Sequence, residues 1–195
     1  INYLGYPGTY GADYIDYIIA DETVIPKENL KFYSEKVLYL PECYQSNMKS
    51  REVTKKDFKR SDFGLPEGAF IFSSFNNNYK ITPGMFDIWM QILNNVPNSV
   101  LWILKSNETA ASNLKNEANK KDVNPDRIIL ADHLPNDEHL KRIKLADLFL
   151  DSFPYNAHTT ASDAVRMGIP IITLKGRSFQ SRVGSSILNC INMKE

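Results

Sequence analysis

The stretch LFLDSFPYNAHTTASDAVRMGIPIIT, from Leu148 to Thr173, decides how this chain folds. Its first apolar run stops at Asp151, a polar loop follows, a helical segment ends at Gly168, and a second apolar run begins. An apolar run, a loop, a helix and another apolar run make up the repeating unit of a parallel sheet covered by helices. The stretch therefore predicts two parallel strands joined by a helix.

The same alternation extends upstream to about Phe70. The apolar runs are short and lack polar alternation, which is typical of parallel strands buried on both faces. Strands are expected at 69–75, 99–104, 127–131, 146–150 and 170–174. Helices are expected from Thr82–Pro83 to Pro97 and over 110–121, 136–144 and 180–188. The fold class predicted is α/β, with one doubly wound, Rossmann-like parallel sheet.

The first part of the chain differs in composition from the rest. Residues 1–45 are rich in Gly and Tyr, with strand-like runs at 17–20 and 36–40 around a helix starting near Pro26. They are expected to form the edge of another lobe, joined by a connector at 46–64 to a main domain over 65–195. The Lys and Arg side chains between Asn47 and Arg60 predict a solvated linker. Because the chain opens in a strand-like context and stops just after an apolar helix, we expect a piece of a longer protein.

Charge and composition narrow the possible partners. The chain has 23 basic and 23 acidic residues and a formal charge of zero, so no broad electrostatic footprint for nucleic acid or an anionic membrane is expected. No segment reaches the roughly 18 uninterrupted apolar residues of a membrane helix. Cys43 and Cys190 match no metal or redox spacing and are expected to be reduced thiols. These features indicate a cytoplasmic protein.

Ligands of parallel sheets gather at the carboxyl ends of the strands. Four polar loops follow predicted strands: Asn76–Lys80, Asp132–His139, the loop before Thr160, and Lys175–Ser178 with Arg182 one turn further. For each loop by itself, a polar loop that caps a helix is the commoner explanation. Four of them at one edge of the sheet favour a shared ligand site.

The third loop has the character of an anion site. Asn156, His158, Thr159 and Thr160 precede the helix, where free backbone N–H groups attract phosphate and hydroxyls add donors. The alternative interpretation is a capping box formed by Thr160 and Asp163, three residues apart. The two interpretations are compatible, because a cap orders the same helix end.

Missing motifs narrow the chemistry further. The chain has no Gly-x-x-x-x-Gly-Lys-Ser/Thr, no Gly-x-Gly-x-x-Gly and no Asp-x-Asp. A sugar-nucleotide enzyme without a carboxylate pair for a divalent ion must stabilise its departing diphosphate with Lys or Arg, a helix start and hydroxyls. Those groups are present here, and Lys80 can act as a point charge. His133, His139 and His158 lack zinc-ligand spacing on one element, so no metal site is expected.

Several motifs together resemble one known family, the catalytic region of O-linked N-acetylglucosamine transferases of the bacterial tetratricopeptide-linked type. The resemblance extends from about Leu4 to Arg182. Its motifs are LGYPGT at 4–9, DYIIAD at 16–21, YSEKVLYLP at 33–41, FNNNYKITP at 75–83, VPNSVLWIL at 96–104 and NAHTTASDAVRMGIPIIT at 156–173.

This resemblance implies an inverting, metal-independent glycosyltransferase of the GT-B kind, without a cofactor. Residues 65–195 would be the incomplete UDP-binding C-terminal lobe, 46–64 the linker and 1–45 the tail of the N-terminal catalytic lobe. The reaction would transfer a hexose, expected to be N-acetylglucosamine, from a UDP-sugar to protein Ser or Thr. The protein acceptor would be bound by tetratricopeptide repeats upstream. The chain alone would bind UDP at best, without turnover.

The resemblance also implies roles for residues near the diphosphate. Lys80 matches the family lysine that offsets charge on the leaving diphosphate and is the candidate catalytic residue. Thr159 and Thr160 match the helix-start residues that bind phosphate, and His158 the neighbouring histidine. Asn77 stands where the animal enzymes carry glutamine, which shortens the reach toward the phosphates.

Other residues would contact the nucleoside. Asp163 matches the carboxylate that accepts hydrogen bonds from ribose hydroxyls, and the backbone near Leu134 would face uracil. His139 and Arg142 fall where the family lines the nucleotide pocket. Asn136 stands where the animal enzymes carry lysine, which removes a positive charge and leaves glucose open as the donor sugar.

Two further functions remain open from the sequence. A UDP-sugar transferase could act on an asparagine side chain or a glycan. A module that binds nucleotides without catalysis would carry the same loops.

Overall fold

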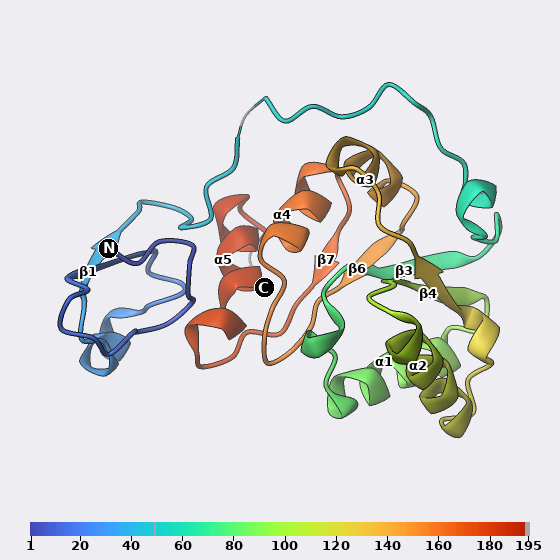
Figure 1. The fold of residues 1–195 in the computed structure, drawn as a ribbon, viewed down its shortest axis with the longest axis horizontal. Coiled ribbons are helices and arrows are strands. Elements are labelled where there is room, and N and C mark those ends of the chain that lie inside the picture. Colours follow the sequence, from blue (N-terminus) through green and yellow to red (C-terminus); the bar gives the residue numbers. More distant parts are fainter. Residues whose placement is uncertain (49, 194–195) are drawn as a thin grey trace.

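The computed structural model describes residues 1–48 and 50–193, whose main feature is a five-stranded, fully parallel sheet (Figure 1). The order across the sheet is β5-β4-β3-β6-β7. The strands are β3 (Phe70–Ser74), β4 (Ser99–Leu104), β5 (Ile128–Ala131), β6 (Leu148–Leu150) and β7 (Ile171–Ile172). Each lies within a run that the sequence predicts.

The strand order makes the sheet doubly wound. Within this sheet, the first strand along the chain is the central strand β3. The chain then proceeds outward through β4 to β5 and returns to the other side of β3 to form β6 and β7. The order reverses between β3 and β6, so the connections after these strands diverge to opposite faces and leave a crevice. The α/β, Rossmann-like fold expected from the sequence is confirmed.

Helices cover both faces of the sheet (Figure 1). Ile71 of β3 packs with one group of helices and its neighbour Phe72 with the other, as alternation along a strand requires. The first group comprises α3 (Asn136–Ile143), α4 (Thr159–Arg166) and α5 (Val183–Cys190), and the second α1 (Pro83–Asn95) and α2 (Glu108–Lys120). Within residues 1–48 and 50–193, no helix is both long and apolar enough to cross a membrane.

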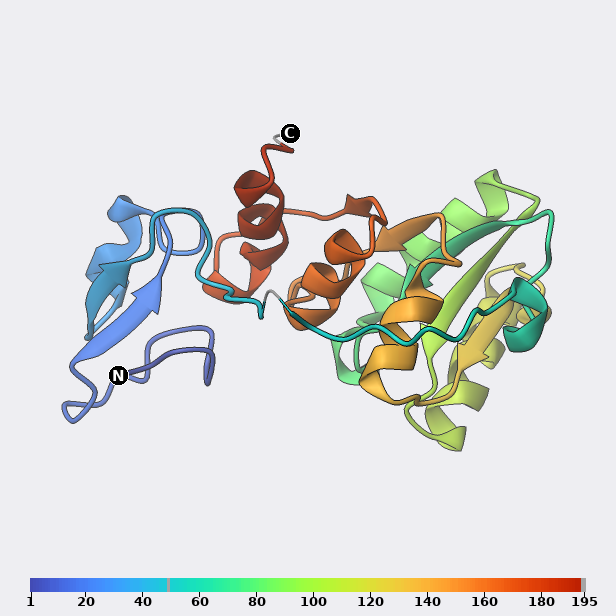
Figure 2. The same cartoon turned by 90° about the horizontal axis from the view of Figure 1, so that it is seen from above.

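Residues 1–45 form a small unit of their own beside α5 (Figures 1 and 2). Strands β1 (Tyr17–Ala20) and β2 (Lys36–Tyr39) pair in parallel, as the sequence predicts. The helix expected from Pro26 is a 3-10 helix over Lys27–Phe32. The assignment of this unit to a separate lobe stays a prediction.

Asp21 fastens this unit to α5. One of its carboxylate oxygens accepts from the backbone N–H groups of Thr23 and Val24 at 2.8 and 2.9 Å. The other accepts from the N–H of Tyr44 at 2.8 Å and from the hydroxyl of Ser186, on α5, at 2.6 Å. Asp21 is only 1% exposed, so these bonds satisfy a buried charge.

The expectation that the connector is a solvated linker holds only in part: Lys55, Lys56 and Lys59 are exposed, whereas Arg51 and Arg60 are largely covered. Its charged side chains form ion pairs with residues of α3, α4 and the turn before β6, and Figure 2 shows it running past α4 and α3. The pairs are Arg51–Asp163, Lys56–Glu138, Asp57–Lys141 and Arg60–Asp147. Its charges complement partners some 80 to 110 positions away in sequence, which a local charge pattern does not reveal.

Gly184, the second residue of α5, lies against the end of β6. A Cβ there would lie 2.8 Å from Oδ2 of Asp151 and closer still to the hydroxyl of Thr173. We expect Gly184→Ala to lower the free energy of unfolding by about 1–3 kcal/mol, because the packed helix has to move. Urea denaturation measures this. The matched control is Gly84→Ala, at the second position of α1 with nothing within 4 Å, which is expected to be neutral or stabilising. Equal stability of the two variants would contradict the prediction.

Candidate functional site

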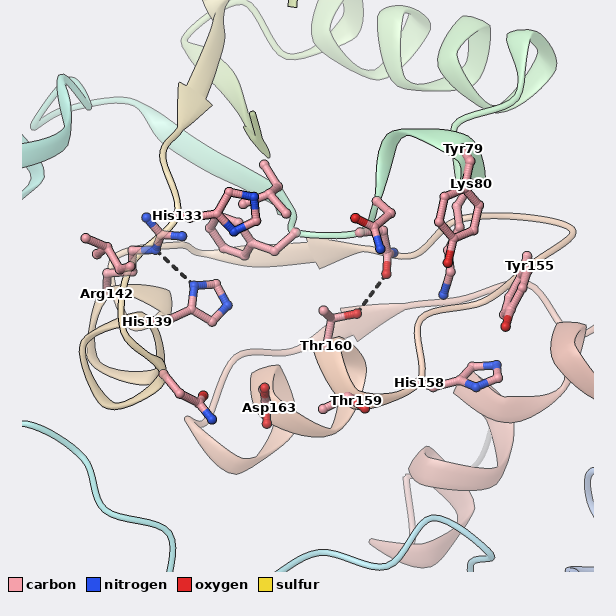
Figure 3. Close-up of a pocket in the computed structure, with 16 residues that line it drawn as sticks. Tyr79, Lys80, His133, His139, Arg142, Tyr155, His158, Thr159, Thr160 and Asp163 are labelled. Atoms are coloured by element: carbon pink, nitrogen blue, oxygen red, sulfur yellow. Dashed lines mark hydrogen bonds between the residues drawn. The ribbon is translucent and has the colours of Figure 1, made fainter. Parts of the chain in front are cut away.

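A cavity of about 500 Å³ opens at the carboxyl edge of the sheet, where the strand order reverses (Figure 3). Its walls come from the loops after β3, β5 and β6, from the end of β4, and from α3 and α4. All nine residues that the sequence singled out for a nucleotide line it: Asn77, Lys80, Leu134, His139, Arg142, His158, Thr159, Thr160 and Asp163. Their individual roles stay predictions.

The fourth predicted loop does not reach this cavity. Lys175–Ser178 and Arg182 are absent from its lining. The guanidinium of Arg182 instead donates to the backbone carbonyls of Thr23 and Gly176. The chain after β7 turns toward residues 1–45 instead, where Arg182 reaches the carbonyl of Thr23.

Lys80 is a buried cation at the end of the loop after β3. Its Nζ donates to the carbonyl oxygen of Asn156 at 2.9 Å and lies 4.1 Å from the centre of the Tyr155 ring. Burial lowers the pKa of Lys80 to about 8, although the nearby charge of Asp151 acts in the opposite direction. A bound anion would relieve this cost of burying a charge.

Asp151 shapes the loop that meets Lys80. Its Oδ1 accepts from the backbone N–H groups of Ser152 and Ala157 at 2.7 and 2.6 Å, and its Oδ2 from the hydroxyl of Thr173 at 2.6 Å. These bonds fold the loop after β6 so that Asn156 presents its carbonyl oxygen to Lys80. Burial raises the pKa of Asp151 to about 6, so the carboxylate is mostly ionised at neutral pH.

The start of α4 faces the same cavity. Within the described residues, the backbone N–H groups of Thr159, Thr160 and Ala161 donate no hydrogen bond, as is usual in a first helical turn. The hydroxyl of Thr160 donates to Oδ1 of the buried Asn76 at 2.7 Å (Figure 3). These three N–H groups, which lack an acceptor among the described residues, and the positive end of the helix dipole are available to an anion.

The capping-box interpretation of Thr160 and Asp163 is wrong. The N-cap of α4 is His158, and no side chain caps it. Thr160 lies inside the helix, with its hydroxyl bonded across the crevice to Asn76, and Asp163 pairs with Arg51. Spacing alone predicted the box, whereas the helix begins at Thr159, two residues earlier than a Thr160 cap requires.

His158 joins the cavity to residues 1–45. Its Nδ1 lies 3.3 Å from the hydroxyl of Tyr44, and its ring packs 5.2 Å from that of Tyr155. Burial, together with the positive charge of Lys80, lowers the pKa of His158 to about 4. The imidazole is therefore neutral at physiological pH.

His139 and Arg142 form a second polar group at the far end of the cavity. The Nε–H of Arg142 donates to Nδ1 of His139 at 3.0 Å, which places the proton of the neutral ring on Nε2 (Figure 3). Burial and the charge of Arg142 lower the pKa of His139 to about 4. Arg142 is 1% exposed and lies 5.3 Å from the ring centre of Phe75. A neutral histidine in this orientation offers one ring N–H donor.

Among the residues that sequence reasoning missed are Tyr155, which lines the cavity, and Arg51, which contacts two of the lining residues. Tyr155 lies within the loop that the sequence singled out, but nothing in the pattern distinguishes it from a solvated loop aromatic. Arg51 was assigned to the linker, although it contacts both Asp163 and Asn136. No local sequence pattern marks Arg51, because its partners lie far from it in the sequence.

Comparison with known proteins agrees with this geometry. The chain matches glycosyl transferase family 41 along residues 1–55 and 49–195. It is 42% identical over 192 residues to a probable UDP-N-acetylglucosamine–peptide N-acetylglucosaminyltransferase, SEC, of Arabidopsis thaliana, covering 96% of this chain and 20% of that protein. A UDP-N-acetylglucosamine–peptide N-acetylglucosaminyltransferase of Caenorhabditis elegans is 33% identical over 158 residues, which are 77% of this chain and 14% of that protein. This chain thus spans a fifth or less of the length of these relatives.

The fold has a close match among solved structures. An O-GlcNAc transferase of Thermobaculum terrenum superposes with a TM-score of 0.84 at 25% identity, covering 98% of this chain and 36% of that one. The expected C-terminal lobe of a GT-B glycosyltransferase is thereby confirmed, as is the family resemblance. The chain belongs to glycosyl transferase family 41.

Proposed function

We propose that this chain forms the UDP-binding part of a glycosyltransferase that transfers a hexose, N-acetylglucosamine, from a UDP-sugar to Ser or Thr of a protein. The observation that carries the proposal is the placement of Lys80 and the three free N–H groups of α4 around one cavity. A cation and a helix start are the groups that stabilise a diphosphate without a carboxylate-bound metal.

The residues of the cavity fall into groups that suit different parts of UDP. Lys80, Thr159 and Thr160 would hold the diphosphate, while Asp163 would accept a ribose hydroxyl and His139 would donate to the base. The hydroxyl oxygen of the acceptor would then form a bond to the anomeric carbon as the bond between that carbon and the diphosphate oxygen breaks, and the hydroxyl proton would pass to the departing UDP or to solvent. The negative charge that develops on the diphosphate is stabilised by Lys80 and the helix dipole. Attack from the face opposite the leaving group makes the reaction inverting, and we propose that no metal takes part.

The other parts of the proposal concern the whole protein. Residues 1–45 are the tail of the N-terminal catalytic lobe, 46–64 the linker and 65–195 the C-terminal lobe. The short coverage of the relatives supports the view that acceptor recognition and the full reaction need further sequence. Tetratricopeptide repeats upstream would bind the protein acceptor in the cytoplasm. The chain alone is expected to bind UDP without turnover.

Calorimetric titration of the chain with UDP, ADP and UDP-sugars tests the proposal. We expect UDP and UDP-N-acetylglucosamine to bind and ADP to bind at least about tenfold more weakly, because the base contacts near His139 are specific. Absence of UDP binding would sink the proposal. A sugar-transfer assay on a longer protein that contains this chain separates an enzyme from a module that binds UDP without catalysis.

A further inference from the structure

Arg51 of the connector contacts two residues that line the cavity. Its Nη1 donates to Oδ1 of Asp163 on α4, and its Nη2 donates to the side-chain oxygen of Asn136 on α3 at 2.7 Å. The side chain of Arg51 is 17% exposed and that of Asp163 6%. Arg51 does not line the cavity itself. It therefore acts on the site through its two partners and joins the start of α3 to the second turn of α4.

The contact determines which part of Asp163 faces a ligand. Arg51 occupies Oδ1, and within the described residues no donor contacts Oδ2. Burial raises the pKa of Asp163, whereas Arg51 and, further along α4, Arg166 lower it. Without Arg51, the carboxylate would be free to rotate and would take up a proton at a higher pH.

We infer that Arg51 is a positioning residue of the nucleotide site: it holds the Asp163 carboxylate so that its second oxygen accepts a hydrogen bond from a ribose hydroxyl of bound UDP. This inference rests on the proposed function. Arg51 of the connector is then part of the donor site. Tight binding of UDP requires that the connector stays in contact with α3 and α4.

The chemistry of the pair explains why arginine stands here. The guanidinium presents several N–H groups in a planar fork, so one side chain reaches a carboxylate on α4 and an amide oxygen on α3 together. A lysine offers one ammonium point charge and cannot span both acceptors in the same way. Arg51→Lys should therefore keep the charge but not the bridge.

The test measures the UDP affinity of the chain by calorimetry at pH 7.5. We expect Arg51→Gln to weaken UDP binding about tenfold and Arg51→Lys to recover part of this loss, since a charged hydrogen bond orients Asp163. Arg60→Gln is the matched control: Arg60 belongs to the same connector and also pairs with an aspartate, Asp147, outside the cavity. Its UDP affinity should stay within twofold of the wild type.

Two further measurements separate positioning from general stabilisation. In an Asp163→Asn background, Arg51→Gln should add less than a twofold loss. In Arg51→Gln alone, UDP affinity should decline at a higher pH than in the wild type as the solution is acidified, because Asp163 protonates more readily. Wild-type affinity in Arg51→Gln, an equal loss in Arg60→Gln, or an undiminished loss in the Asp163→Asn background would each overturn the inference. A wild-type chain that fails to bind UDP would instead overturn the proposed function on which it rests.

Discussion

Lys80→Met is expected to reduce sugar transfer by a longer protein containing this chain at least about 100-fold, and to weaken UDP binding by the chain about tenfold. The reason is that Lys80 supplies a buried positive charge where the diphosphate would develop negative charge. Lys105→Met is the control. Lys105 follows β4 at the same edge of the sheet, but it pairs with Glu108 and lies outside the cavity. Equal losses in the two variants would contradict the role of Lys80.

The same substitution should leave the fold intact or strengthen it. The pKa of Lys80 is lowered from 10.5 to about 8, so the unfolded state binds more protons than the folded state between these values. Stability from this group therefore rises as the pH rises from about 8 to 10.5, and the charged form is a cost to the fold at neutral pH. Methionine removes that cost, so a thermal melt of Lys80→Met at pH 7 should give an equal or higher Tm. A lower Tm would indicate that the variant loses binding by unfolding.

Asp151→Ala is expected to abolish detectable UDP binding and to lower the free energy of unfolding by about 2–4 kcal/mol. It removes the acceptor of two backbone N–H groups and one hydroxyl, all of which are left unsatisfied in a buried loop. The loop then no longer presents the carbonyl of Asn156 to Lys80. Urea denaturation and UDP titration, made on the same sample, measure the two effects.

Asp151→Asn separates the shape of the loop from its charge. The asparagine oxygen can still accept from Ser152 and Ala157, but the negative charge that raises the pKa of Lys80 is gone. Lys80 then loses its proton at a lower pH than in the wild type, so as the pH is raised UDP affinity should begin to fall at a lower pH than in the wild type. Weak binding of the asparagine variant at every pH would show that the charge effect is not the cause.

The sheet was predictable because its signals are local. Each strand is a short apolar run between polar loops, and burial on both faces makes such runs distinctive. The N-cap Thr82 and the following Pro83 likewise predict the start of α1, and the hydroxyl of Thr82 accepts a hydrogen bond from the N–H of Met85. These features depend on neighbours within a few residues.

The parts that failed depend on contacts between distant residues. Arg51 and Asp163 are separated by 112 positions, so the charge run of the connector could not be distinguished from a solvated linker. Arg182 left the predicted site because residues 1–45 offer it the carbonyl of Thr23. The nine residues predicted for a nucleotide nevertheless line one cavity, since parallel strands bring their carboxyl ends to one edge of the sheet.

The bond between Tyr44 and His158 links the cavity to the position of residues 1–45. Residues 1–45 are held to α5 through Asp21, and Tyr44 extends from that anchor to the residue that precedes α4. Any hinge rotation that moves this unit away must break the bond or displace His158 beside Lys80. Because linkage is reciprocal, a ligand that binds only the intact arrangement would stabilise it by the same factor by which that arrangement strengthens ligand binding.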